Sequence, residues 1–204
     1  MKQFKLNEKE YEMPTSWKDM DLARYVELAK LDETKDSFGI PELYLLRVIE
    51  ALCAAQNGDL DDLTLSMVNE LSSEVGFLQE QPEWSNTRHL VIEGNDYVFP
   101  INLNTLSMGE LISIKTLQEG QNSQAEFIPW LLAVILRPGK KVYDEETKKE
   151  VWVQDKFNTA NLEWRKDLFM RQPVFDLMGP VSFFLNGNET YMNSIKDSIP
   201  EAQK

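Results

Sequence analysis

The sequence predicts an α+β fold that is mostly α-helical and built as two related halves, each a short β-hairpin followed by about three helices. Two observations lead to this prediction. Alternating apolar residues end in Tyr-Glu-Met-Pro at residues 11–14, and a similar stretch ends in Tyr-Val-Phe-Pro at residues 97–100. Each copy then continues into a segment whose apolar residues recur with the period of a helix.

The two copies align without a gap at an offset of 86 residues (97 minus 11). Only the tyrosine and proline pairs are identical, and chance similarity is the alternative, because a hairpin followed by a helix is a common arrangement. The ungapped register favours an internal duplication. The other aligned pairs share apolar character: Phe4 with Leu90, Leu6 with Ile92, Met13 with Phe99, Trp17 with Leu103, Met20 with Leu106, Leu22 with Met108, Tyr25 with Leu111, Val26 with Ile112, Leu28 with Ile114 and Leu31 with Leu117.

Each copy opens with two alternating stretches separated by a loop, which is the pattern of a β-hairpin. The loops are Asn-Glu-Lys at residues 7–9 and Glu-Gly-Asn-Asp at residues 93–96, and both are suitable hairpin loops. Pro14 and Pro100 follow the second stretch of each copy. Because proline has no backbone N–H, each is expected to end its strand pair.

Two helices are expected to follow each hairpin. Asp21 and Ser107 are suitable N-caps for the first of these helices, and Ser107 with Glu110 fits a capping box. The second helix of each half is almost wholly apolar, which is typical of a core helix. It is expected to begin near Pro41 in the first half and near Pro129 in the second, since proline is well tolerated in the first turn.

A third helix is predicted to close each half, over residues 60–78 in the first and residues 164–185 in the second. Two prolines interrupt the later one. Pro173 is expected to start its last segment, and Pro180 to kink or split it.

The chain therefore divides into a first half at residues 1–80, a second half at residues 81–186 and a polar tail at residues 187–204. The break between the halves is expected in the polar stretch at residues 79–86. Each half alone is near the low end of the size of independent domains, so one shared core is expected.

The second half carries an insert at residues 137–153 that has no counterpart in the first. Its Pro138-Gly139 pair is a turn signal. Beyond it, residues 141–144 and 149–153 are predicted to pair as a small hairpin across the Glu-Glu-Thr-Lys between them. A charged surface helix is the competing prediction for these residues.

The net charge of −13 argues against direct nucleic-acid binding, since an acidic surface is repelled by phosphate backbones. The single cysteine, Cys53, lies in an apolar run and is expected to be a buried structural thiol in a reducing compartment. The N-terminus lacks the pattern of a signal peptide, and the most apolar stretch, residues 127–136, is too short to span a bilayer. The sequence predicts a soluble, intracellular protein without membrane contact.

No P-loop, dinucleotide-binding or zinc-protease motif occurs in the chain. The single histidine, His89, precedes a predicted strand and is expected at a surface or an edge strand. The acidic clusters at residues 59–62 and 144–146 lack the spacing and the glycine of a calcium loop, and residues 59–62 are expected to cap a helix N-terminus. We expect no enzymatic activity, no cofactor and no metal site.

Protein binding is therefore the expected activity, and four residues are the candidates for it. Trp84 lies in the polar stretch between the halves, where an aromatic side chain has no evident core position. Val142, Tyr143 and Trp152 lie in the insert, which the halves do not share. The remaining aromatic residues at helical spacing are expected in the core.

Several motifs resemble a family of acidic helical proteins from tailed bacteriophages, including crAss-like gut phages. They are Tyr-Glu-Met-Pro followed by Thr-Ser-Trp-Lys-Asp-Met-Asp-Leu, then Leu-Arg-Pro-Gly-Lys-Lys-Val-Tyr-Asp-Glu, and late Pro-Val-Phe and Val-Ser-Phe-Phe segments. Members of this family look like tail assembly chaperones or small virion structural proteins. The resemblance covers about residues 4–185, and its motifs mark core and turn positions, so no functional residue follows from it.

The resemblance implies a non-enzymatic protein that binds other phage proteins during tail or virion assembly. Its expected partners are the tape measure and tail or portal-ring components, and it could form a homo-oligomer. It would be found in the cytoplasm of the infected bacterial host, in the virion, or in both. The alternatives are a permanent virion component such as a ring, connector or tail subunit, and a host-directed inhibitor or small enzyme.

Overall fold

The structure is a computed structural model that describes residues 1–100, 105–182 and 184–185. Within these residues about half of the chain is helical, and the strands form two small antiparallel sheets. The predicted α+β class is therefore confirmed. No helix in the described ranges has both the length and the apolar composition needed to cross a membrane.

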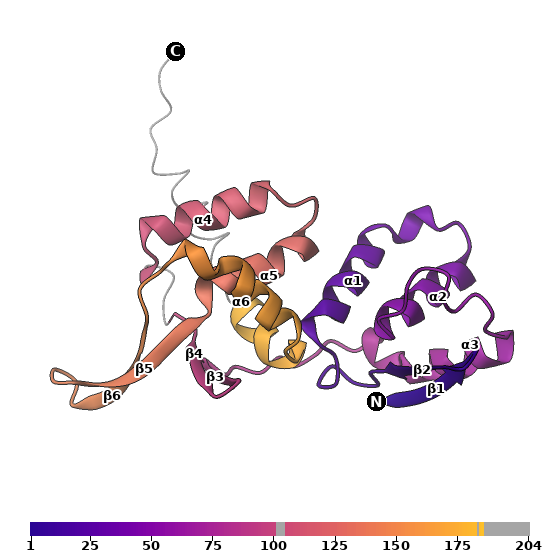
Figure 1. Ribbon diagram of the computed structural model, residues 1–204, viewed down its shortest axis with the longest axis horizontal. Helices are drawn as coiled ribbons and strands as arrows, with labels where there is room; N and C mark the ends of the chain where they lie inside the picture. Colours follow the sequence, from indigo (N-terminus) through magenta and orange to yellow (C-terminus); the bar gives the residue numbers. More distant parts are fainter. Residues whose placement is uncertain (101–104, 183, 186–204) are drawn as a thin grey trace, which may run out of the picture.

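The first half forms the right-hand lobe in Figure 1, where a hairpin lies beside three helices. Its elements are β1 (Lys2–Leu6), β2 (Lys9–Met13), α1 (Leu22–Glu33), α2 (Pro41–Leu52) and α3 (Leu65–Glu74), with short 3₁₀ turns at Lys35–Ser37 and Gly76–Gln79.

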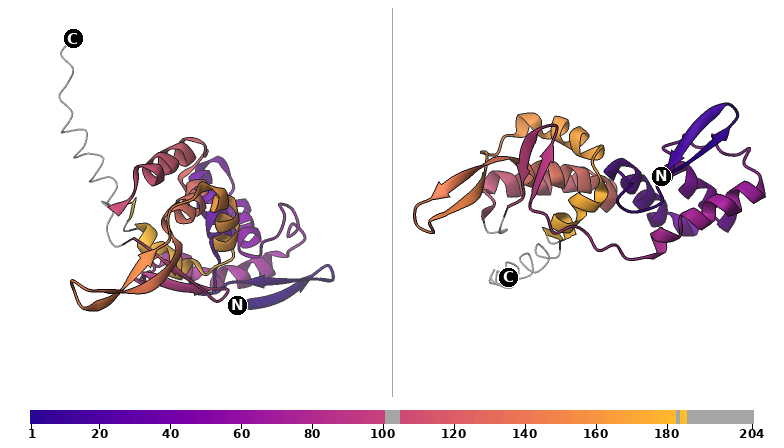
Figure 2. Two further views of the ribbon diagram at one scale, coloured as in Figure 1. Left: turned by 60° about the vertical axis from the view of Figure 1, so that its left-hand side comes forward. Right: turned by 90° about the horizontal axis from the view of Figure 1, so that it is seen from below.

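The second half forms the left-hand lobe, and both views in Figure 2 show a pair of strands that extends away from it. The last helical segment comprises the described residues 174–182 and 184–185. The other elements are β3 (His89–Ile92), β4 (Asn95–Val98), α4 (Met108–Glu119), α5 (Gln124–Ile135), β5 (Arg137–Asp144), β6 (Lys149–Gln154) and α6 (Leu162–Met170), with a 3₁₀ turn at Thr159–Asn161.

Both predicted hairpins form, and they pair in equivalent registers. Phe4 lies opposite Tyr11 in the first hairpin, and Leu90 lies opposite Tyr97 in the second. Two-residue hairpin loops favour positive φ, and both loops have it: Asn7 and Glu8 in the first, Glu93 and Gly94 in the second.

The helices that follow the hairpins also start where the capping residues predict. The Asp21 side chain accepts from the Arg24 N–H at 2.8 Å, and Ser107 with Glu110 forms the capping box. α1 and α4 each contain 12 residues, and their starts are again 86 residues apart (108 minus 22). The internal duplication stays a prediction. Leu103, which the alignment pairs with Trp17, lies outside the described residues.

Pro41 begins α2 as predicted, but the prediction for Pro129 is wrong. α5 starts at Gln124, because the Ser123 side chain caps it by accepting from the Glu126 N–H at 3.2 Å. Pro129 therefore lies inside the helix. α5 tolerates this proline because most of the helix is buried, so its packing outweighs one missing backbone hydrogen bond.

The third helix of the first half is shorter than predicted, and Thr64 caps it in place of residues 59–62. The aspartates of that cluster do not cap α3, and two of them contact the first hairpin. Asp59 pairs with Lys9 at 2.6 Å and Asp62 accepts from Asn7 at 2.7 Å, both on the β1–β2 hairpin.

The third helix of the second half is divided, and the break joins the two lobes. α6 ends at Met170, and the next segment begins directly after Pro173, as predicted. Between them the Leu22 N–H donates to the Gln172 carbonyl at 3.0 Å, and the Val174 N–H donates to the Met20 carbonyl at 2.9 Å. Pro180 lies inside the final segment and does not split it.

One cluster of buried apolar residues runs through both halves. α5 lies against α4 and α6 of its own half and against α1 of the other. The Tyr97 ring packs edge-on against Phe169 at 5.5 Å and ties the β3–β4 hairpin to α6. The expectation of one shared core is therefore confirmed for the described residues.

Candidate protein-binding site on a projecting hairpin

The predicted hairpin of the insert forms, and the competing surface helix is wrong. β5 pairs with β6 from Gly139 opposite Gln154 to Asp144 opposite Lys149. We call residues 139–154 the arm. In Figures 1 and 2 the arm extends away from both lobes, and only its base lies against the body.

The predicted turn at Pro138-Gly139 is wrong, because both residues belong to β5. Pro138 lies opposite Tyr97 of β4, and its carbonyl accepts from the Asp155 N–H at 2.8 Å. A β-carbon at Gly139 would lie 2.8 Å from both the Val153 carbonyl and a Val98 methyl. Glycine is therefore required where three strands converge, and the insert joins the sheet as β3-β4-β5-β6.

A buried polar network holds the base of the arm. Arg137 forms an ion pair with Glu110 of α4 at 2.8 Å and donates to the Gln154 side chain at 3.0 Å. Gln154 in turn donates to the Val98 carbonyl and, at 2.7 Å, to the Ile135 carbonyl. Burial lowers the pKa of Arg137, while Glu110 and Asp155 oppose that shift. The base is thus fixed to β4, α4 and α5.

Trp152 fixes one face of the arm to the edge of the sheet. Its ring stacks on His89 of β3 with centroids 4.1 Å apart, and the Lys141 ammonium lies 5.5 Å from its centroid. β3 is the first strand of the four-stranded sheet, so His89 lies on an edge strand as predicted. The His89 ring also hydrogen-bonds to the Asp96 carboxylate. The structure places Trp152 as a half-buried support of the arm.

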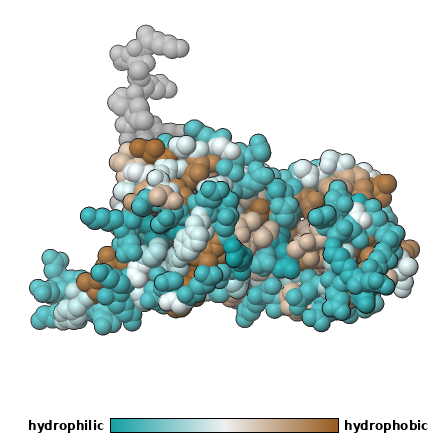
Figure 3. Space-filling model, in the orientation of Figure 1, coloured by the Kyte–Doolittle hydropathy of each residue, from teal (hydrophilic) through white to brown (hydrophobic). Residues whose placement is uncertain are grey.

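The outer part of the arm exposes apolar side chains on both faces. Val142 is 39% exposed and Val153 45% exposed on one face, while Tyr143 is 60% exposed on the other. Figure 3 shows apolar residues on the arm within a hydrophilic surround. β6 is also an edge strand, and such strands present unpaired backbone groups to solvent.

The tip of the arm is an ordered, charged turn. Asp144 accepts from the Thr147 hydroxyl at 2.6 Å and from the Glu146 N–H at 3.0 Å. These bonds hold the pKa of Asp144 below its ordinary value. Four lysines and four acidic residues alternate along the arm, so it lacks the strong negative charge of the whole chain.

Trp84 packs against other aromatic side chains, so the expectation that it has no core position is wrong. Its ring packs against Trp17 at 5.4 Å and Tyr25 at 6.2 Å. The linker that carries it lies against the final helical segment, where the Ser85 N–H donates to the Phe175 carbonyl at 3.1 Å. The structure gives Trp84 a packing role, and its part in partner binding stays a prediction.

Cys53 is expected to be an unreactive structural thiol, and its reactivity can be measured. The thiol is buried, and burial raises its pKa to about 12. The thiolate is the reactive form, so we expect Cys53 in the folded protein to react with Ellman's reagent at pH 8 more than tenfold more slowly than in denaturant. Equal rates in both states would contradict the buried position.

Among the described residues, no group of three or more His, Cys, Asp or Glu side chains has a metal-binding arrangement.

Two parts of the site were missed by sequence reasoning. Val153 lies in the run Val-Trp-Val, where every residue is apolar, so alternation does not identify the exposed face. The network of Glu110, Arg137 and Gln154 joins residues far apart in the chain. Only the capping-box position of Glu110 was visible beforehand.

Comparisons of this chain with protein-family models, with curated proteins and with solved structures each gave no match. The functional conclusion therefore rests on the geometry of the chain and on the sequence motifs described above.

Proposed function

We propose that this chain is a non-enzymatic protein of a tailed bacteriophage that binds other phage proteins during tail or virion assembly. The observation that carries the proposal is the arm. It is held rigidly at its base and exposes Val142, Tyr143 and Val153 away from the body. The resemblance of the sequence motifs to those of phage tail and virion proteins suggests the class of partner.

The arm suits a partner that contributes an extended segment. An edge strand can accept another strand through main-chain hydrogen bonds, while alternate side chains supply specificity. β6 offers such an edge, and the exposed valines lie on one face beside it. A two-stranded hairpin with exposed apolar side chains is marginally stable in water, so a covering partner would also stabilise the arm.

Co-expression with the tape-measure protein of the same genome tests the proposal. We expect the two proteins to co-elute, and we expect Val142→Asp to weaken the complex about tenfold or more, because burying one valine contributes about 1.5–3 kcal/mol. The melting temperature of the variant alone should stay close to that of the parent chain.

Leu65→Asp is the matched control, since Leu65 is 69% exposed on the other lobe and an acidic residue in the first turn of α3 is well tolerated. Equal weakening by both variants would argue against the arm as the contact surface. Failure to co-elute would exclude the tape measure as the partner. Mass spectrometry of purified particles separates the two assembly roles: a stoichiometric amount indicates a permanent component, and absence indicates a chaperone.

A further inference from the structure

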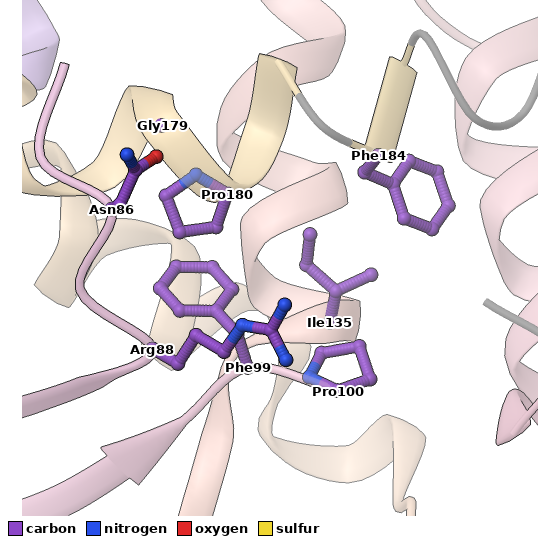
Figure 4. A pocket seen from close by; sticks show the side chains of 8 residues that line it. All are labelled: Asn86, Arg88, Phe99, Pro100, Ile135, Gly179, Pro180 and Phe184. Carbon is purple, nitrogen blue, oxygen red and sulfur yellow. The ribbon is translucent and has the colours of Figure 1, made fainter. Parts of the chain in front are cut away.

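The second half contains a pocket that shares no residue with the arm. Its volume is about 210 Å³, and its walls come from the linker, the end of β4, the end of α5 and the last helical segment. Figure 4 shows the side chains of Phe99, Ile135, Pro180 and Phe184 around the space, with Arg88 extending across one side. The other lining residues are Asn86, Pro100 and Gly179.

The interior of the pocket is apolar and its size is limited. Phe99, Ile135 and Phe184 are buried side chains of the core, so the space is bounded by fixed apolar walls. Small-molecule and cofactor pockets typically measure about 300–1,000 Å³. The pocket is therefore suited to one amino-acid side chain, whose binding would release water from apolar surface.

Among the described residues that line the pocket, Arg88 alone carries a charge. Its side chain is exposed at the rim and makes no hydrogen bond or ion pair with any described residue. Asn86, also at the rim, adds an amide that can donate and accept. Guanidinium groups bind carboxylates through two parallel hydrogen bonds, so the rim is complementary to a carboxylate.

We propose that this pocket binds the C-terminal residue of a partner protein when that residue has an apolar side chain. Only a C-terminal residue carries a carboxylate and an apolar side chain on the same α-carbon, which matches one cation beside one small apolar pocket. The carboxylate would pair with Arg88, and the side chain would contact Phe99, Ile135 and Phe184. The net charge of −13 opposes an anion at long range, but physiological salt screens charges beyond about 8 Å.

N-acetyl-leucine and N-acetyl-leucinamide test this inference on the full chain by two-dimensional amide NMR. The acid represents a C-terminal leucine, and the amide represents the same side chain inside a chain. We expect millimolar acid to shift the resonances of the pocket residues, and the amide to bind at least tenfold more weakly. Arg88→Gln should weaken binding of the acid by a similar factor and leave the weak binding of the amide unchanged.

Arg171→Gln is the control, because Arg171 is also exposed, carries the same charge and is not among the residues that line the pocket. It should leave binding of the acid unchanged. The inference would be overturned by any of three results: equal affinity for the acid and the amide, shifts of amide resonances that lie only outside the pocket, or no shifts at millimolar acid. The result is independent of the arm, since Val142→Asp leaves all eight lining residues intact.

Discussion

Replacing Gly179 by alanine is expected to destabilise the protein by about 3 kcal/mol, the upper end of typical overpacking costs. A β-carbon at this position would lie 1.9 Å from the Ser85 carbonyl oxygen, which is a backbone atom that cannot rotate away. Gly179 lies in a helix, where alanine is normally favoured by about 1 kcal/mol, so the clash must outweigh that gain. Thermal or urea unfolding measures the net effect.

Gly76→Ala is the matched control for this prediction. A β-carbon at Gly76 meets nothing within 4 Å, so its replacement should change stability little. A Gly179→Ala protein as stable as the parent would mean that the linker does not lie against the final helical segment. The expected loss therefore tests the contact between the linker and the last helical segment near Trp84.

Glu110→Ala is expected to cost about 3–5 kcal/mol, because it leaves the guanidinium of Arg137 buried without its anionic partner. Glu110 also closes the capping box of α4, where its carboxylate accepts from the Ser107 N–H at 2.7 Å and the Ser107 hydroxyl at 2.6 Å. Loss of these bonds adds to the cost. The free energy of unfolding from urea titration gives the size of the effect.

Two further variants separate the ion pair from general damage to α4. Glu119→Ala removes an exposed carboxylate at the far end of the same helix and should have little effect. The double variant Glu110→Leu with Arg137→Met should be less destabilised than the sum of the two single changes, since no unpaired charge remains buried. Strictly additive losses would show that the two side chains do not interact.

Local patterns predicted most of the elements of the fold. The two hairpins, both first-helix caps and the start of α2 follow from interactions within a few residues, such as the capping box of Ser107 and Glu110. The β5–β6 hairpin was also predicted from a local pattern, two short stretches separated by a four-residue turn. The errors at Pro129 and Pro138 arose because packing and strand pairing outweigh the usual position of proline.

The candidate site was predicted only in part. The sequence indicated that the insert is the distinctive surface, and Val142 and Tyr143 are exposed there. It did not distinguish their role from that of Trp152, which stacks on His89, nor did it show that Trp84 packs against Trp17. Both differences depend on partners more than 50 residues away in the chain, and no local pattern reports such contacts.

By itself, the sequence determined the class of fold, the position of both hairpins and the acidic surface, because alternation, capping residues and charge are properties of short segments. The tertiary structure decided where the insert goes. Arg137, Gly139 and Gln154 fix the base of the arm against β4, α4 and α5. Arg88 meets the apolar pocket only after the linker folds against the last helical segment. These features depend on packing between distant segments, so they exist only once the chain has folded.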